Sequence, residues 1–249
     1  MKSLDLSAVT PDHQATATWA AVLLHAIARE EAAARLPPRV TEQGLATWNR
    51  FKGRLNATDF LDLLFEDAAV LHQVPFAATA VEAPARVGRL PAHLVEKWLQ
   101  SVPQLDLKAS PADYITEQAR LLGLPFRMAR SDLHVIKPHQ KVLELPGSGG
   151  QLAHHLVTNQ KDLTLQANFT IACGTWQEQT LAGVVALACG APSGEYIVRA
   201  TAETMKAVEH PLRQRTFDFV IGLAPDKGGQ FKIADQLAIW FPNAKIVLV

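Results

Sequence analysis

The feature that most limits the fold is a regular alternation of short apolar runs and helical patterns in the second half of the sequence. Between the apolar runs lie helical patterns at residues 151–158, 176–189, 202–210 and 230–241. Strands that alternate with helices of this length predict βαβ units and a parallel, doubly wound α/β sheet. The expected strands are residues 141–145, 169–173, 196–199, 217–221 and 244–249.

The first half has mainly helical spacing. Apolar residues of the stretch 19–28 recur three and four positions apart, and Thr58 is a typical N-cap for a helix that follows it. Pro91 and Pro111 each stand where a helix is expected to begin, and Gly123 ends the last one. We therefore expect a helical domain at residues 1–125 and an α/β domain at 126–249. Residues 126–136 alternate loosely and are open to a strand or a hairpin arm.

The composition describes an ordinary globular protein. Hydrophobic residues make up 48% and charged residues 19%, which excludes wholesale disorder. Lysine and arginine number 24, as do aspartate and glutamate, so bulk charge does not favour nucleic-acid binding. Two short basic clusters, residues 211–215 and the arginines at 29, 35 and 39, could contact phosphates or be solvated faces. Cys173 and Cys189 have apolar neighbours and are expected to be buried, reduced thiols.

The N-terminus has no apolar segment of the kind found in signal peptides, and no run approaches eighteen apolar residues. The expected localisation is cytoplasmic, with no membrane contact. His154 and His155 are adjacent and point in different directions, while His134 and His139 have no cysteine or carboxylate spaced to complete a metal site. A hydrolase nucleophile elbow of the form GxSxG is also absent from the sequence.

The glycine turn after the first expected strand carries the strongest functional signal. Gly147-Ser148-Gly149-Gly150 leads from that strand directly into a helix. Glycines permit positive φ and close approach of a ligand, and a helix N-terminus offers free N–H groups to an anion or a carboxylate. Glu144, at the strand end, could accept hydrogen bonds from ligand hydroxyls or an ammonium group. The turn is neither GxGxxG nor a Walker A sequence, which argues against classical dinucleotide binding and P-loop NTPase activity.

The segment VLELPGSGGQLAHHL resembles the first motif of class I S-adenosylmethionine-dependent methyltransferases. Its GSGG ending is closest to the adenine-specific DNA methyltransferases of restriction–modification systems. FTIACGTWQEQTLAGVVALACG is similar to that family's second strand and helix, EYIVRATAET stands in the third-strand position, and FDFVIGLAPD in the fourth. The resemblance implies a Rossmann-like methyltransferase sheet that binds S-adenosylmethionine.

Carried over by position, the resemblance implies a set of cofactor-binding residues. The methionine end of the cofactor would lie against Glu144 and the loop residues Gly147, Ser148 and Gly149. Glu178 is the one acid available for the ribose, although it lies several residues late. The adenine ring would be bracketed by Thr201 or Glu203.

Three departures from the family pattern bear on function. After the fourth strand the amino-methyltransferases carry Asn, Asp or Ser followed by Pro-Pro-aromatic, whereas this chain has Gly222-Leu-Ala-Pro-Asp, leaving Pro225 and Asp226 as the candidate catalytic residues. The first motif is one residue short, and Pro146 stands where the family has a small residue. The sheet is expected to be truncated after the fifth strand, which leaves an apolar edge for a protein partner or a second copy.

Two functions are therefore expected from the sequence. The first is a methyltransferase-like protein that has lost catalysis and acts as a binding or scaffolding subunit, with a residual S-adenosylmethionine or nucleotide pocket. The alternative is an active S-adenosylmethionine-dependent methyltransferase acting on nucleic acid or on another unfamiliar substrate. A different Rossmann-like nucleotide binder is a third reading.

Overall fold

In a computed structural model the chain folds into two compact units, Met1–Tyr114 and Ile115–Val249, and the boundary along the chain falls inside the helix Pro111–Leu121. The sequence analysis placed this boundary after residue 125. The structure describes residues 20–21, 23–25, 27–28, 31, 39–51, 57–64, 92–102, 111–125, 136–189, 196–201, 204–223 and 227–249.

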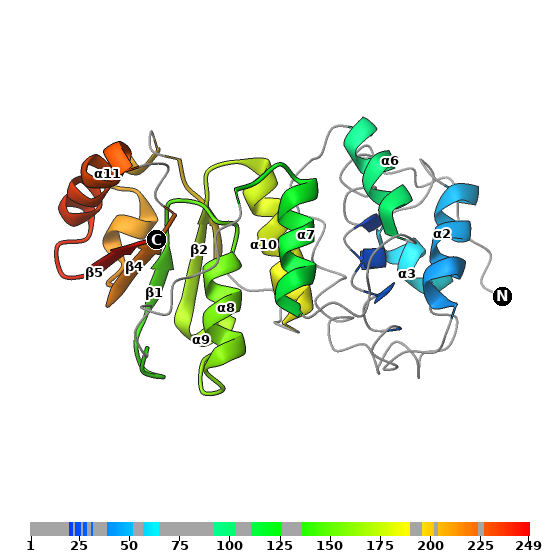
Figure 1. The fold of residues 1–249 in the computed structure, drawn as a ribbon, viewed down its shortest axis with the longest axis horizontal. Helices are drawn as coiled ribbons and strands as arrows, with labels where there is room; N and C mark the ends of the chain where they lie inside the picture. The colour runs from blue at the N-terminus through cyan, green and yellow to red at the C-terminus, as the bar shows by residue number, and fades with distance from the viewer. Residues whose placement is uncertain are drawn as a thin grey trace. The chain divides into compact units, whose positions relative to one another are not determined.

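The described part of the first unit is helical (Figure 1). Helices α3 (Ala57–Leu64) and α6 (Ala92–Ser101) confirm two predicted helices, whereas α2 (Val40–Phe51) was not predicted. A third predicted helix, α7 (Pro111–Leu121), is confirmed at the boundary between the units and lies mostly in the second. Trp48 and Trp98 are buried, as expected of core residues. The ring of His25 is also buried, and its Nε2 lies 3.0 Å from the carbonyl oxygen of Trp98.

The second unit is built on a five-stranded, fully parallel sheet with the order β3-β2-β1-β4-β5. All five predicted strands are confirmed, and the unit is therefore α/β. Strands β2 and β3 lie on one side of β1, and β4 and β5 lie on the other. The strand order therefore reverses between β1 and β4. The strands are β1 (Val142–Glu144), β2 (Phe169–Cys173), β3 (Ile197–Arg199), β4 (Phe219–Gly222) and β5 (Lys245–Leu248).

Helices connect most of these strands. The helices α8 (Gln151–Asn159), α10 (Trp176–Ala188) and α11 (Lys227–Trp240) follow the predicted alternation, whereas the short helix α9 (Leu165–Asn168) was not predicted. The helix predicted at residues 202–210 is wrong, because the described residues there form the short 3-10 turn η3 (Thr204–Lys206), followed by η4 (Pro211–Gln214). Thr204 Oγ1 accepts from the Thr201 backbone N–H at 2.8 Å, a local bond that competes with helix formation.

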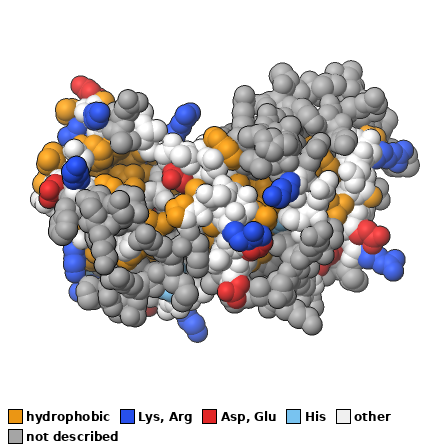
Figure 2. Space-filling view, turned by 45° about the horizontal axis from the view of Figure 1, so that its top comes forward, with side chains coloured by type: hydrophobic (Ala, Val, Ile, Leu, Met, Phe, Trp, Pro, Cys, Tyr) orange, Lys and Arg blue, Asp and Glu red, His pale blue; other side chains and the backbone are white. Residues whose placement is uncertain are grey.

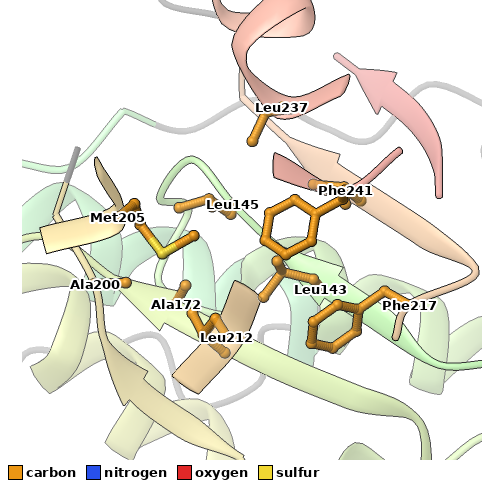
Figure 3. Close-up of a cluster of buried hydrophobic side chains, with 10 residues drawn as sticks. Leu143, Leu145, Ala172, Ala200, Met205, Leu212, Phe217, Leu237 and Phe241 are labelled. Atoms are coloured by element: carbon orange, nitrogen blue, oxygen red, sulfur yellow. The ribbon is translucent and has the colours of Figure 1, made fainter. Parts of the chain in front are cut away.

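A cluster of buried apolar side chains fills one face of the sheet beneath α11 (Figure 3). The rings of Phe217 and Phe241 meet edge to face, with centroids 5.7 Å apart. Every residue of β2 is buried, as expected for a strand covered on both faces. Cys173 is a buried free thiol and Cys189 is partly exposed, so the expected burial holds fully only for Cys173. The cluster consists of Leu143, Leu145, Ala172, Ala200, Met205, Leu212, Phe217, Val220, Leu237 and Phe241.

None of the helices in the described part of the chain is long and apolar enough to span a membrane.

Candidate ligand-binding site

A cavity of about 450 Å³ lies at the carboxyl ends of β1, β2 and β3. Open parallel α/β sheets bind ligands at this edge, close to the point where the strand order reverses. Three stretches of backbone that follow the strands form its floor, at residues 145–147, 174–175 and 200–201. Helix α11 contributes the opposite wall with Lys232, Ile233, Gln236, Leu237 and Trp240.

Glu144 turns away from this cavity. Its side chain is fully buried, and Oε1 accepts from the backbone N–H of Gly150 at 2.7 Å and from the hydroxyl of Ser148. Oε2 accepts from the backbone N–H of Ala153, the third residue of α8, at 2.8 Å. Burial raises the pKa of Glu144, while these hydrogen bonds act in the opposite direction. The carboxylate therefore binds its own loop and the first turn of α8, rather than facing a ligand.

This position of Glu144 changes what the N-terminus of α8 can bind. A helix N-terminus attracts anions because its first N–H groups lack partners inside the helix. Here a protein carboxyl group already accepts from two of the N–H groups at this end. The arrangement argues against a phosphate or pyrophosphate at the glycine turn.

The glycine turn itself is packed against the protein. Gly149 and Gly150 have φ values of 61° and 88°, which favour glycine. A Cβ on Gly149 would lie 3.0 Å from the backbone oxygen of Glu178, and Ser148 is 1% exposed. Of the predicted loop residues, Gly147 lines the cavity, whereas Ser148 and Gly149 do not belong to its described lining.

Glu178 lies directly over Gly147. A Cβ added to Gly147 would overlap the Glu178 carboxylate, with Oε1 the nearest oxygen and Oε2 2.5 Å away. Oε2 accepts from the backbone N–H groups of Gly174 at 2.5 Å and Thr175 at 3.2 Å, and the Glu178 N–H donates to Thr175 Oγ1 at 3.2 Å. This reciprocal arrangement is a capping box at the start of α10. Its signature, Thr-Trp-Gln-Glu, is readable in the sequence.

The second carboxylate oxygen of Glu178, Oε1, is the one that lies closest to Gly147. Within the described residues, no hydrogen-bond donor is assigned to Oε1, and Glu178 lines the cavity. Lys232 is the other charged residue among the described lining residues, and it is exposed. The remaining wall is largely apolar, so the cavity suits a ligand with a flat or apolar body and hydroxyl groups that donate to a carboxylate.

Thr201 also lines the cavity, where the sequence analysis placed the residue that brackets a ring. Its hydroxyl accepts from the backbone N–H of Thr204 at 3.1 Å and is therefore already engaged. The other candidate at this position, Glu203, and the candidate catalytic residues Pro225 and Asp226 lie outside the described residues.

Gly222, at the end of β4, packs against the chain that follows β1. A Cβ at this position would be 2.5 Å from Pro146 Cδ and 2.6 Å from the carbonyl carbon of Leu145. Two backbone hydrogen bonds fix the chain around Gly222. Leu145 N–H donates to the Ile221 carbonyl at 2.7 Å, and Leu223 N–H donates to the Pro146 carbonyl at 3.3 Å. The site thus has no room for any side chain at position 222.

The wall of the cavity formed by α11 and Met205 was not predicted from the sequence. Ile233, Leu237 and Trp240 recur at helical spacing, so their common face was readable in the sequence. Nothing in that spacing indicated that the face covers the carboxyl ends of the strands. In Figure 2, apolar side chains appear on the visible face of the sheet-bearing unit, at the left, among scattered charged residues.

A second, more open cleft of about 670 Å³ lies at the opposite, amino edge of the sheet, with Lys141 and Arg215 among its lining residues. Lys141 Nζ donates to the Ala167 carbonyl at 2.5 Å. The general preference of parallel sheets for ligands at their carboxyl ends favours the first cavity as the functional site.

The described residues support neither a metal site nor a reactive cysteine. No three His, Cys, Asp or Glu side chains in the described ranges are grouped to hold a metal ion. Burial raises the pKa of the Cys173 thiol well above its usual value, which disfavours the reactive thiolate.

Comparison with protein-family models, with curated proteins and with solved structures finds no match for this chain.

Proposed function

We propose that the chain is a methyltransferase-like binding subunit that has lost methyl transfer and retains a cavity for a nucleoside-containing ligand. Three observations support this proposal. The strand order β3-β2-β1-β4-β5 is that of the first five strands of the Rossmann-like arrangement. A glycine turn follows β1, and the cavity lies at the carboxyl ends of β1 to β3.

The single observation that carries the loss of catalysis is the packing of Gly222. In the amino-methyltransferases that the sequence resembles, this position holds a polar side chain that accepts from the target amino group. Here even a Cβ would overlap Pro146 Cδ at 2.5 Å. The polar acceptor is therefore missing from the sequence, and the packing around Gly222 leaves no space for it.

A nucleotide ligand is less well supported than a nucleoside. Phosphate groups bind well where helix N–H groups are free, and Glu144 accepts from those of Gly150 and Ala153 at α8. The Glu178 carboxylate in the cavity would also repel a phosphate.

The test of the proposed function is a methyl-transfer assay with labelled S-adenosylmethionine, using double-stranded DNA and cell-extract protein as acceptors. We expect no label transfer above the background of heat-inactivated protein. Repeated turnover would instead establish the alternative, an active methyltransferase, and Asp226→Ala would then test the candidate catalytic residue.

Ligand binding is tested separately by calorimetric titration with adenosyl ligands. Ile233→Trp fills the cavity wall, while Ile239→Trp adds the same ring to the exposed side of α11, where Ile239 is 68% exposed. Binding should be lost in the first variant and kept in the second. Equal binding by both variants would contradict the assignment of the cavity.

The scaffolding role is placed at strand β5. One edge of β5 pairs with β4, and no other described strand pairs with its second edge. Ile246 and Leu248 pack against the core cluster, Val247 is half-buried, and the unpaired edge of an apolar strand favours pairing with another strand. We expect Val247→Lys, at the strand position between the core-packed Ile246 and Leu248, to abolish self-association or partner binding in light scattering. An unchanged molar mass and unchanged partner binding would rule out this edge.

A further inference from the structure

The cavity at the carboxyl ends of the strands is closed at one end by a side chain. Glu178 covers Gly147 so closely that a Cβ there would overlap its carboxylate, with Oε1 the nearest oxygen and Oε2 2.5 Å away. The backbone N–H groups of Gly174 and Thr175 hold the carboxylate in this position at 2.5 and 3.2 Å. Any part of a ligand that ran across Gly147 would have to displace Glu178 and break the capping box.

Glu178 brings a negative charge to the end of the cavity at Gly147. No ion pair of Glu178 is described, and the other charged residue of the described lining, Lys232 on α11, is exposed to solvent. Glu144 accepts from the nearby N–H groups of Gly150 and Ala153, so those donors cannot balance an anionic ligand group. A phosphate or a carboxylate brought to this end would lose its hydration and meet a like charge.

We propose that Glu178 makes the cavity selective for uncharged nucleosides and excludes ligands that carry a phosphate or an amino-acid group on the sugar. This inference rests on the proposed function, because it takes a nucleoside-containing ligand as the occupant. The free Oε1 of Glu178 accepts from the sugar hydroxyls. The base lies against the apolar wall formed by Ile233, Leu237 and Trp240.

The size of the cavity agrees with this assignment. Its volume of about 450 Å³ lies in the lower part of the range of roughly 300–1,000 Å³ for small-molecule sites. A bare nucleoside needs no space across Gly147, whereas S-adenosylmethionine carries an amino-acid group beyond its ribose. Glu178 thus acts as a specificity-determining residue through both its bulk and its charge.

The test uses pairs of ligands that differ in one group. Methylthioadenosine and S-adenosylhomocysteine share the adenosine and the thioether, but only the second carries the amino-acid group. Adenosine and AMP differ by one phosphate. Calorimetric titration of the wild-type protein should give at least tenfold tighter binding for the uncharged member of each pair.

Two substitutions separate bulk from charge. Glu178→Ala removes both, so the preference for methylthioadenosine over S-adenosylhomocysteine should shrink to within about threefold. Glu178→Gln retains the bulk and a capping-box side chain, so it should keep that preference while improving AMP binding. Glu209→Ala, an exposed acid outside the cavity lining, is the matched control and should leave all affinities unchanged.

The outcomes distinguish the inference from the proposed function. If S-adenosylhomocysteine binds the wild type as tightly as methylthioadenosine, the role of Glu178 is refuted and the nucleoside cavity stands. An unchanged preference in Glu178→Ala refutes it in the same way. If no nucleoside binds the wild type or either variant, and thermal melts show all three folded, both the inference and the nucleoside cavity fail.

Discussion

Replacing Gly222 with alanine tests the close packing between the end of β4 and the chain after β1. The new Cβ would lie 2.5 Å from Pro146 Cδ, which is 0.9 Å closer than the 3.4 Å at which ordinary contact begins. The neighbouring atoms include backbone, and they are fixed by the hydrogen bonds from Leu145 to Ile221 at 2.7 Å and from Leu223 to Pro146 at 3.3 Å. Relief of the overlap must therefore separate β1 from β4.

The magnitude follows from two opposing effects. Overpacking a tight site costs typically 1–3 kcal/mol, and a rigid backbone neighbour places this case near the upper end. Replacing a glycine within a strand by alanine recovers about 0.5–1 kcal/mol of unfolded-state entropy. The expected net loss is about 2 kcal/mol in the free energy of unfolding of the sheet unit.

Native-state hydrogen exchange, read on peptides that contain β1 and β4, measures this loss in the sheet unit alone. Gly174→Ala is the matched control, because the nearest atoms to its Cβ would be 3.5 Å away, at ordinary contact distance. We expect faster exchange in Gly222→Ala and no significant change in Gly174→Ala. A Gly222→Ala protein within 0.5 kcal/mol of the wild type would refute the packing argument and its consequence for catalysis.

Three further predictions concern hydrogen bonds and buried ionisable groups. Thr175→Ala removes the hydroxyl of the capping box and should cost about 1 kcal/mol in urea unfolding, whereas Thr175→Ser should restore most of it; equal stabilities would contradict the box. Burial lowers the pKa of His25 to about 4, so stability is fully present above pH 6.5 and falls between pH 6.5 and 4, by about 3 kcal/mol. NMR titration of the His25 ring should show no protonation above pH 5. Burial raises the pKa of Glu144 above 4.5, so its contribution to stability is complete below pH 4.5 and declines as the pH rises through the folded-state value. Glu144→Gln should remove that part of the pH dependence, and an unchanged pH profile would count against a raised pKa.

The positions of the strands along the chain and their parallel pairing were predictable because they depend on local sequence pattern. Each apolar run in the second half is short, and β2 is buried at every residue, as a parallel strand with two covered faces must be. The alternation with helices then requires a doubly wound sheet. The same reasoning failed at residues 202–210, where the side chains of Thr201 and Thr204 bond to the local backbone and a proline follows at position 211.

The directions in which the side chains of Glu144 and Glu178 point were not predictable from the sequence. The sequence places Glu144 at a strand end and Glu178 in the first turn of a helix, and both positions are compatible with ligand binding or with a structural role. Packing of α8 against the sheet turns Glu144 inward to the N–H groups of Gly150 and Ala153. Approach of α10 to the glycine turn brings Glu178 over Gly147.

The sequence by itself determined the parallel sheet, the glycine turn and the absence of a polar residue at position 222, since these depend on residue type and spacing along the chain. Only the tertiary structure decided which residues form the cavity, because α11 reaches the carboxyl edge of the sheet through packing between segments distant in sequence. It also decided that position 222 has no room for a side chain. The reason is that Pro146 and Gly222, far apart in the chain, are brought into contact by the pairing of β1 with β4.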